Sequence, residues 1–101
     1  MPKAKQKMST ENLKEKNLYQ KEVNLWGFES EEQMMIEEMA ELTTALCHIS
    51  RNRGSIEAVM EEIADVEIML NQMKIIFPSI EAIKKKKLER LALRVDEKKE
   101  Y

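Results

Sequence analysis

The sequence predicts an all-α protein, a four-helix bundle, on three observations. Only two glycines and two prolines interrupt the 101 residues, so long helices are possible. Eight methionines, few aromatic residues and a hydrophobic content of 43% are typical of helical cores. Apolar residues in the middle of the chain recur at alternating gaps of four and three, which is the spacing of one helix face. We expect residues 1–101 to form a single domain, because this length supports one small core.

The N-terminal part should contain a tail and one helix. Residues 1–9 are polar and rich in lysine without periodicity, so we expect a flexible basic tail. A first helix is predicted over about 11–25, and Gly27 should end it. Its apolar stripe consists of Tyr19, Val23 and Trp26.

The second helix is predicted over about 31–52, with Ser30 as its N-cap. The turn over 51–54 should end it. Cys47 lies in this apolar helix, which favours a buried structural role for its thiol. The core stripe of the helix consists of Met35, Met39, Leu42, Leu46 and Ile49.

Two further helices should complete the bundle. Ser55 is expected to cap a third helix over about 56–77, and Pro78 breaks its pattern. A fourth helix over about 80–98 can be capped by Ser79. The short turns between the second and third helices, and between the third and fourth, should make these neighbours antiparallel. The stripe of the third helix consists of Val59, Ile63, Val66, Leu70, Met73 and Phe77.

Two acidic motifs of the form Glu-Glu-x-x-acid are the most informative feature of the chain. Carboxylates three residues apart share one helix face, and each pair borders a core stripe. Antiparallel packing brings the two pairs to a similar height, facing each other across ~8–10 Å of interhelical space. Carboxylates clustered beside apolar residues are costly without a cation, and oxygen ligands suit Mg²⁺, with Mn²⁺ as a substitute. The two pairs are Glu38 with Glu41, and Glu62 with Asp65.

Other interpretations of the polar residues remain open. Acidic motifs are also typical of a solvated helix face, in a chain with nineteen acidic residues. A ferritin-like di-iron site needs Glu-x-x-His, but Ala45 stands three residues before His48, the only histidine. His48 lies seven residues after Glu41 on the same face, where it is either a helix-end polar residue or a substrate contact.

The aromatic and basic residues indicate a substrate-binding site less strongly than the acidic motifs do. Trp26 suits a core anchor, a hydrophobic staple or a platform on which a base stacks. The lysine run over 84–87 covers every face of the fourth helix, so part of it must be solvated. Lys87 and Arg90 share a face and are the better candidates for contacting phosphate. The chain has no Gly-rich phosphate loop, so phosphates would be held by metal and basic side chains.

Composition argues against several classes of protein. A net charge of −2 gives no electrostatic case for nucleic-acid binding. The single cysteine excludes an intrachain disulfide and fits a reducing compartment, so we expect a cytoplasmic protein. No apolar run reaches the ~18 residues of a membrane span, and no signal-peptide segment is present at the N-terminus. We therefore expect no membrane partner.

The order of the motifs resembles that of the MazG-like, all-α nucleoside triphosphate pyrophosphohydrolases. Glu38-x-x-Glu41 followed by Glu62-x-x-Asp65 on consecutive helices carries the resemblance. The segment over 26–33 looks like the stretch before the first motif in short, often phage-encoded members. The second motif over 61–70 and the basic segment over 87–91 are similar as well, and the resemblance covers about residues 18–95.

The resemblance implies Mg²⁺-dependent hydrolysis of nucleoside triphosphates to monophosphate and pyrophosphate. It implies that Glu38, Glu41, Glu62 and Asp65 are the metal ligands, and that Glu41 or Glu38 orients or deprotonates the attacking water. Trp26 and Gln33 would lie near the substrate, and Lys87 and Arg90 would approach the phosphates, from the same or a neighbouring subunit. A homodimer or homotetramer is implied. The alternative from another class is a non-catalytic helical interaction module that binds a partner helix through its Met-rich stripe.

Overall fold

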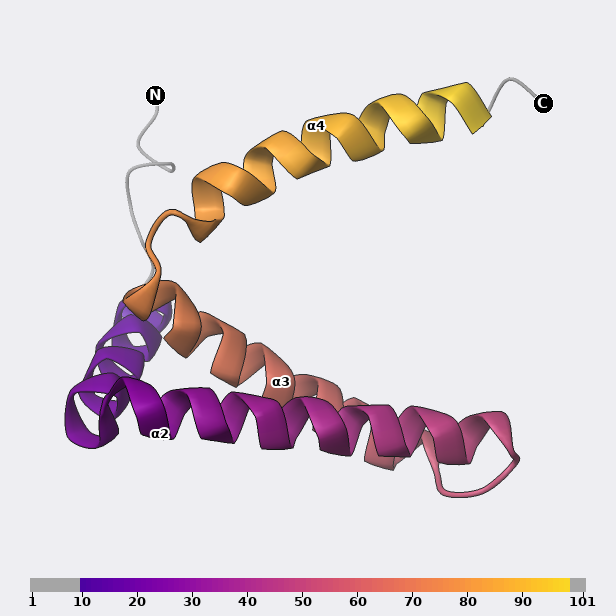
Figure 1. The fold of residues 1–101 in the computed structure, drawn as a ribbon, viewed down its shortest axis with the longest axis horizontal. Coiled ribbons are helices and arrows are strands. Elements are labelled where there is room, and N and C mark those ends of the chain that lie inside the picture. Colours follow the sequence, from indigo (N-terminus) through magenta and orange to yellow (C-terminus); the bar gives the residue numbers. More distant parts are fainter. Residues whose placement is uncertain (1–9, 99–101) are drawn as a thin grey trace.

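The computed structural model describes residues 10–98, which form three α-helices and no strand. They are α2 (Thr10–Ser50), α3 (Ile56–Ile76) and α4 (Ile80–Lys98) (Figure 1). The predicted all-α class is therefore confirmed for this part of the chain. The tail predicted over residues 1–9 lies outside the described residues.

Gly27 divides α2 into two helical segments. Its backbone has φ 83° and ψ 171°, a combination that is essentially restricted to glycine. The predicted break at Gly27 is confirmed. The prediction that Ser30 caps the next segment is wrong, because Gly27 is the only non-helical residue inside α2 and Ser30 already has helical geometry. The glycine alone makes the bend, so no separate cap follows it.

A tight turn reverses the chain between α2 and α3. Asn52 and Gly54 both adopt positive φ, at 61° and 71°. The Ser55 side chain then accepts a hydrogen bond of 3.1 Å from the backbone N–H of Ala58, as expected of an N-cap. Helices α2 and α3 consequently run antiparallel and side by side, as the sequence predicts (Figure 1).

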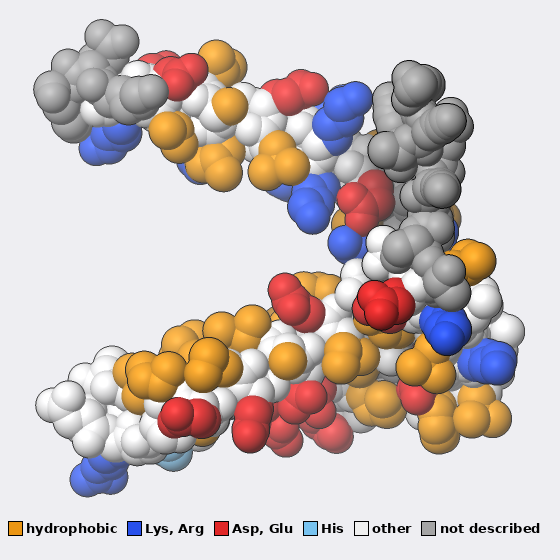
Figure 2. All heavy atoms as spheres, turned by 180° about the vertical axis from the view of Figure 1, so that it is seen from behind, with side chains coloured by type: hydrophobic (Ala, Val, Ile, Leu, Met, Phe, Trp, Pro, Cys, Tyr) orange, Lys and Arg blue, Asp and Glu red, His pale blue; other side chains and the backbone are white. Residues whose placement is uncertain are grey.

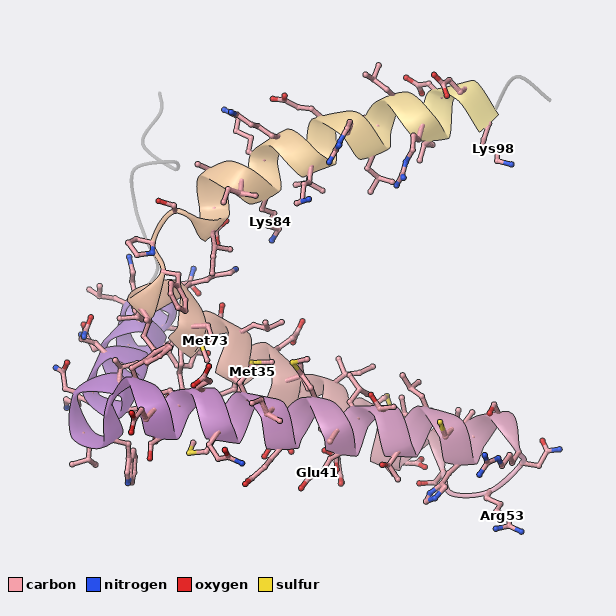
Figure 3. All side chains as sticks on the ribbon, viewed as in Figure 1. Met35, Glu41, Arg53, Met73, Lys84 and Lys98 are labelled. Atoms are coloured by element: carbon pink, nitrogen blue, oxygen red, sulfur yellow. The ribbon has the colours of Figure 1, made fainter. Side chains whose placement is uncertain are left out.

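The core lies between α2 and α3 and is small. Met35 and Met69 are the buried apolar residues of the described chain, and Figure 3 shows Met35 and Met73 between these two helices. The predicted stripes are only partly covered, since Met39 and Leu46 remain about half exposed. Within residues 10–98, extensive helix packing is confined to the α2–α3 pair, so residues at the margin of each apolar face keep contact with water.

Cys47 is exposed, so the predicted buried role of its thiol is wrong. It lies on α2, whose extensive packing partner among the described residues is α3. With a single neighbour, a large part of the α2 surface stays uncovered even where the sequence is apolar.

Helix α4 diverges from the other two helices after Pro78 (Figure 1). No described residue of α4 is buried, and its start is tied to α3 by an ion pair of 2.8 Å between Lys74 and Glu81. An edge-to-face contact between Phe28 and Phe77, with ring centroids 5.8 Å apart, closes the nearby end of the α2–α3 pair. A four-helix bundle is therefore not observed within one chain.

Candidate metal centre

Three carboxylates from α2 and α3 converge on one side of the helix pair. Glu38 and Glu41 belong to α2, and Glu62 belongs to α3. One oxygen from each lies within 4.8 Å of the others, and we call these three residues the carboxylate cluster. Figure 3 shows Glu41 on the side of α2 that faces away from α4, and Figure 2 shows acidic side chains gathered along that edge.

Part of the carboxylate cluster is withdrawn from water. Glu38 and Glu62 are half buried, whereas Glu41 is exposed. One carboxyl oxygen of Glu38 and one of Glu62 are inaccessible to water and have no hydrogen-bond partner among the described residues. Buried oxygens without a donor are costly, so these two atoms are suited to a cation.

The electrostatics of the carboxylate cluster also favour a bound cation. Burial raises the pKa of Glu38, and the negative charges of Glu41, Asp65 and Glu62 raise it further. Burial also raises the pKa of Glu62, followed by the charges of Glu41 and Asp65. The ionised cluster is therefore destabilised by mutual repulsion, which a divalent cation would relieve.

Asp65, the fourth predicted ligand, stands beside the carboxylate cluster but outside it. Its side chain is exposed, and its oxygens are not within the 4.8 Å group. It is near enough for its charge to raise the pKa of both Glu38 and Glu62.

None of the four predicted substrate contacts lines the space beside the carboxylate cluster. Trp26 is about half exposed on the first segment of α2, and the Gln33 amide donates a 3.3 Å hydrogen bond to Glu37. Lys87 lies on α4, where it lines a hollow beside α3, and Arg90 is exposed on the same helix. Because α4 diverges on the side opposite to Glu41, neither basic residue reaches the carboxylates within one chain (Figure 3).

A hollow of about 360 Å³ extends from the carboxylate cluster toward the α2–α3 turn. Glu41 and Glu62 stand at one end, and His48 and Gly54 lie at the other. Its walls between these ends are formed by the small side chains of Ala40, Thr44, Ala45 and Ala58. The sequence indicated that His48 shares a face with Glu41, but the hollow itself depends on the small residues of both helices.

Two buried polar residues in the α2–α3 interface were not predicted from the sequence. Glu31 is fully buried, and both of its carboxyl oxygens lack a hydrogen-bond partner among the described residues. Gln72 on α3 is also buried, and its side-chain oxygen is likewise without a partner. Glu31 precedes Met35 by one helical turn, so extending the core stripe backward would have placed it in the interface.

No protein-family model, curated protein or solved structure matches this chain. The resemblance to MazG-like enzymes therefore stays a prediction from the motifs. Within residues 10–98, none of the helices combines the length and the apolar character that crossing a membrane requires.

Proposed function

We propose that this chain is a Mg²⁺-dependent nucleotide pyrophosphohydrolase that cleaves ribo- or deoxynucleoside triphosphates to monophosphate and pyrophosphate. The carboxylate cluster is the observation that carries the proposal. It combines the ligand type that Mg²⁺ prefers with buried oxygens that have no other partner. The order of the motifs resembles that of MazG-like enzymes, and we infer the type of reaction from this resemblance.

In this proposal Glu38, Glu41 and Glu62 hold the metal, and Asp65 completes the ligand set. When bound, Mg²⁺ supplies positive charge that neutralises the triphosphate oxygens and makes water more acidic. The carboxylates contribute a fixed, partly dry arrangement, so little reorganisation is needed when the substrate enters.

The reaction breaks the anhydride bond between the α and β phosphates. A water oxygen forms the new bond to phosphorus, pyrophosphate leaves, and a carboxylate of Glu41 or Glu38 accepts the proton of the water. Glu41 is exposed and can contact solvent water, whereas Glu38 is half buried and can contact the metal.

Assembly into a homodimer or homotetramer belongs to the same proposal. The carboxylate cluster carries only negative charge, whereas seven of the nineteen residues of α4 are lysine or arginine. Since α4 diverges from its own carboxylates, a neighbouring subunit is the natural source of Lys87 and Arg90 near the phosphates. Trp26 and Gln33 remain candidates for the substrate contacts that the motif resemblance implies.

A panel of ribo- and deoxynucleoside triphosphates tests this function. The purified chain is incubated with each compound and Mg²⁺, and pyrophosphate release is measured against a sample containing a metal chelator. We expect Mg²⁺-dependent release from at least one triphosphate.

The same panel separates the enzyme from the alternative of a non-catalytic interaction module. That alternative is favoured by the many exposed apolar side chains on α2 and α4, which would suit a partner helix. A complete absence of pyrophosphate release from every compound would support the module and contradict the enzyme.

A further inference from the structure

The hollow beside the carboxylate cluster is suited to an uncharged ligand group. Glu41 and Glu62 are its only charged lining residues, and neither lysine nor arginine lines it within the described chain. Anionic phosphates would be repelled there unless a cation stood between them and the carboxylates. Its volume of about 360 Å³ falls within the range of ~300–1,000 Å³ that is usual for small-molecule sites.

Two polar groups of the hollow can recognise a heteroaromatic ring: Thr44 in its wall and His48 at the end distant from Glu62. The Thr44 hydroxyl donates to the backbone oxygen of Ala40 at 3.0 Å, so its oxygen faces a ligand as an acceptor only. His48 offers an exposed imidazole that can stack on a planar ring or hydrogen-bond to its edge.

The α2–α3 turn holds His48 in place at the rim. The backbone oxygen of His48 accepts hydrogen bonds from the N–H groups of Arg51 at 3.0 Å and Arg53 at 2.7 Å. Gly54 packs closely against this residue, since a Cβ atom at position 54 would lie 3.3 Å from the Cβ of His48, and its φ of 71° also favours glycine. The turn therefore fixes the backbone of His48 at one end of the hollow, and Gly54 lines the hollow beside it.

We propose that this hollow receives the nucleobase of the substrate, with His48 as the residue that contacts the ring and sets base preference. The inference rests on the proposed function, because it assumes that the phosphates are held at the carboxylate cluster. It places the base toward the α2–α3 turn, on the side of Glu41 distant from Trp26 and Gln33, neither of which lines the hollow. The small residues Ala45 and Ala58 give the ring its space.

The test compares a triphosphate that has a base with one that has none. KM and kcat are measured for the best nucleoside triphosphate, and inorganic tripolyphosphate is used as a competitive inhibitor. For His48→Ala we expect the nucleotide KM to rise about tenfold, within the range of one lost stacking contact, while kcat and the tripolyphosphate inhibition constant stay unchanged. His48→Phe should restore most of the KM, because the phenyl ring preserves stacking.

Cys47→Ser is the matched control, since Cys47 is the exposed neighbour of His48 and does not line the hollow. Its kinetics should equal those of the wild type. An unchanged nucleotide KM in His48→Ala, or an equal loss of tripolyphosphate binding, overturns the base assignment. A wild-type protein that hydrolyses no nucleoside triphosphate contradicts the proposed function itself, so the two failures are distinguishable.

Discussion

At the scale of single residues, unpartnered carboxyl oxygens are the main chemical feature of this chain. The spacing of the acidic motifs and the antiparallel turn suffice to predict that Glu38, Glu41 and Glu62 meet, and their oxygens lie within 4.8 Å. The place of Asp65 outside this group was not predictable, because motif spacing gives the face of a residue but not the reach of its side chain. The structure therefore shows three clustered carboxylates with a fourth acidic neighbour.

Asp65→Asn should abolish most of the activity while the fold is retained. The substitution keeps the size of the side chain and removes its charge, so we expect turnover to fall on the order of a hundredfold or more. Pyrophosphate release and circular dichroism are measured together. Glu67→Gln is the control, because the charge of Glu67 acts on Tyr19 rather than on the carboxylate cluster. Wild-type turnover in Asp65→Asn, or equal inactivity in Glu67→Gln, would show that the second motif is misassigned.

Glu31 should make the fold less stable as the pH rises. Burial, and then the charge of Glu22, raise the pKa of Glu31 above its ordinary value of 4.5. Because its pKa is raised, the contribution of Glu31 to the free energy of unfolding is complete below its unfolded-state pKa. This contribution is lost as the pH rises through its folded-state pKa. Glu31→Gln removes this loss, so we expect a higher Tm at neutral pH and little change near pH 4.

The size of that effect follows from the cost of a buried polar group. Removing an unsatisfied buried charge should raise the free energy of unfolding by about 1–3 kcal/mol. Each kcal/mol moves the Tm of a domain of this size by about 4–8 °C. Thermal melts at several pH values provide the measurement. Glu32→Gln, at an exposed neighbouring position, should change the Tm by much less. Equal shifts in both variants at neutral pH would argue against a special role for the buried carboxyl.

At the scale of the helices, the boundaries were mostly predictable because turn chemistry marks them. Ser55 caps α3 as its sequence position suggested, and Gly27 interrupts α2. The cap assigned to Ser30 failed because a glycine in an unusual conformation bends a helix without unwinding the residues after it. Sequence patterns do not distinguish such a bend from two helices joined by a loop.

Gly27→Ala should destabilise the protein through backbone geometry rather than crowding. No atom lies within 4 Å of a Cβ built at Gly27, so space is available, but φ at 83° is strained for any L-residue. We expect a loss of ~1–3 kcal/mol in the free energy of unfolding, measured by chemical denaturation. Glu29→Ala, an exposed position just beyond the bend, should cost far less. An unchanged stability in Gly27→Ala would mean that the bend is not required for folding.

At the scale of the whole molecule, one chain leaves much apolar surface uncovered. Among the described residues, large apolar side chains are exposed on all three helices, including Leu25 (70%), Ile56 (59%) and Leu93 (63%). Figure 2 shows apolar side chains along α4 and along the facing side of the α2–α3 pair. The sequence predicted enough apolar residues for a bundle, but composition does not reveal whether all its helices come from one chain.

Light scattering should therefore detect a dimer or a larger assembly at tens of micromolar. Exposed apolar side chains that gather on facing helix sides are typical of subunit interfaces. Leu91→Glu places a charge on the apolar side of α4 and should shift the population toward monomer. Lys86→Glu, about 140° around the same helix at ~100° per residue, is the control. A wild-type protein that is entirely monomeric would contradict this account of the exposed surface.

The most direct test of the central claim, that the carboxylate cluster binds Mg²⁺, is the Tm measured with and without millimolar Mg²⁺. A ligand that binds only the folded state raises the Tm, and at one hundred times its Kd it adds about 2.7 kcal/mol. We predict a rise of several degrees for the wild type and for the control pair Glu37→Gln with Glu61→Gln, which changes exposed neighbours by the same charge. The pair Glu38→Gln with Glu62→Gln should show no rise. An equal rise in this last variant would contradict a metal site at these residues.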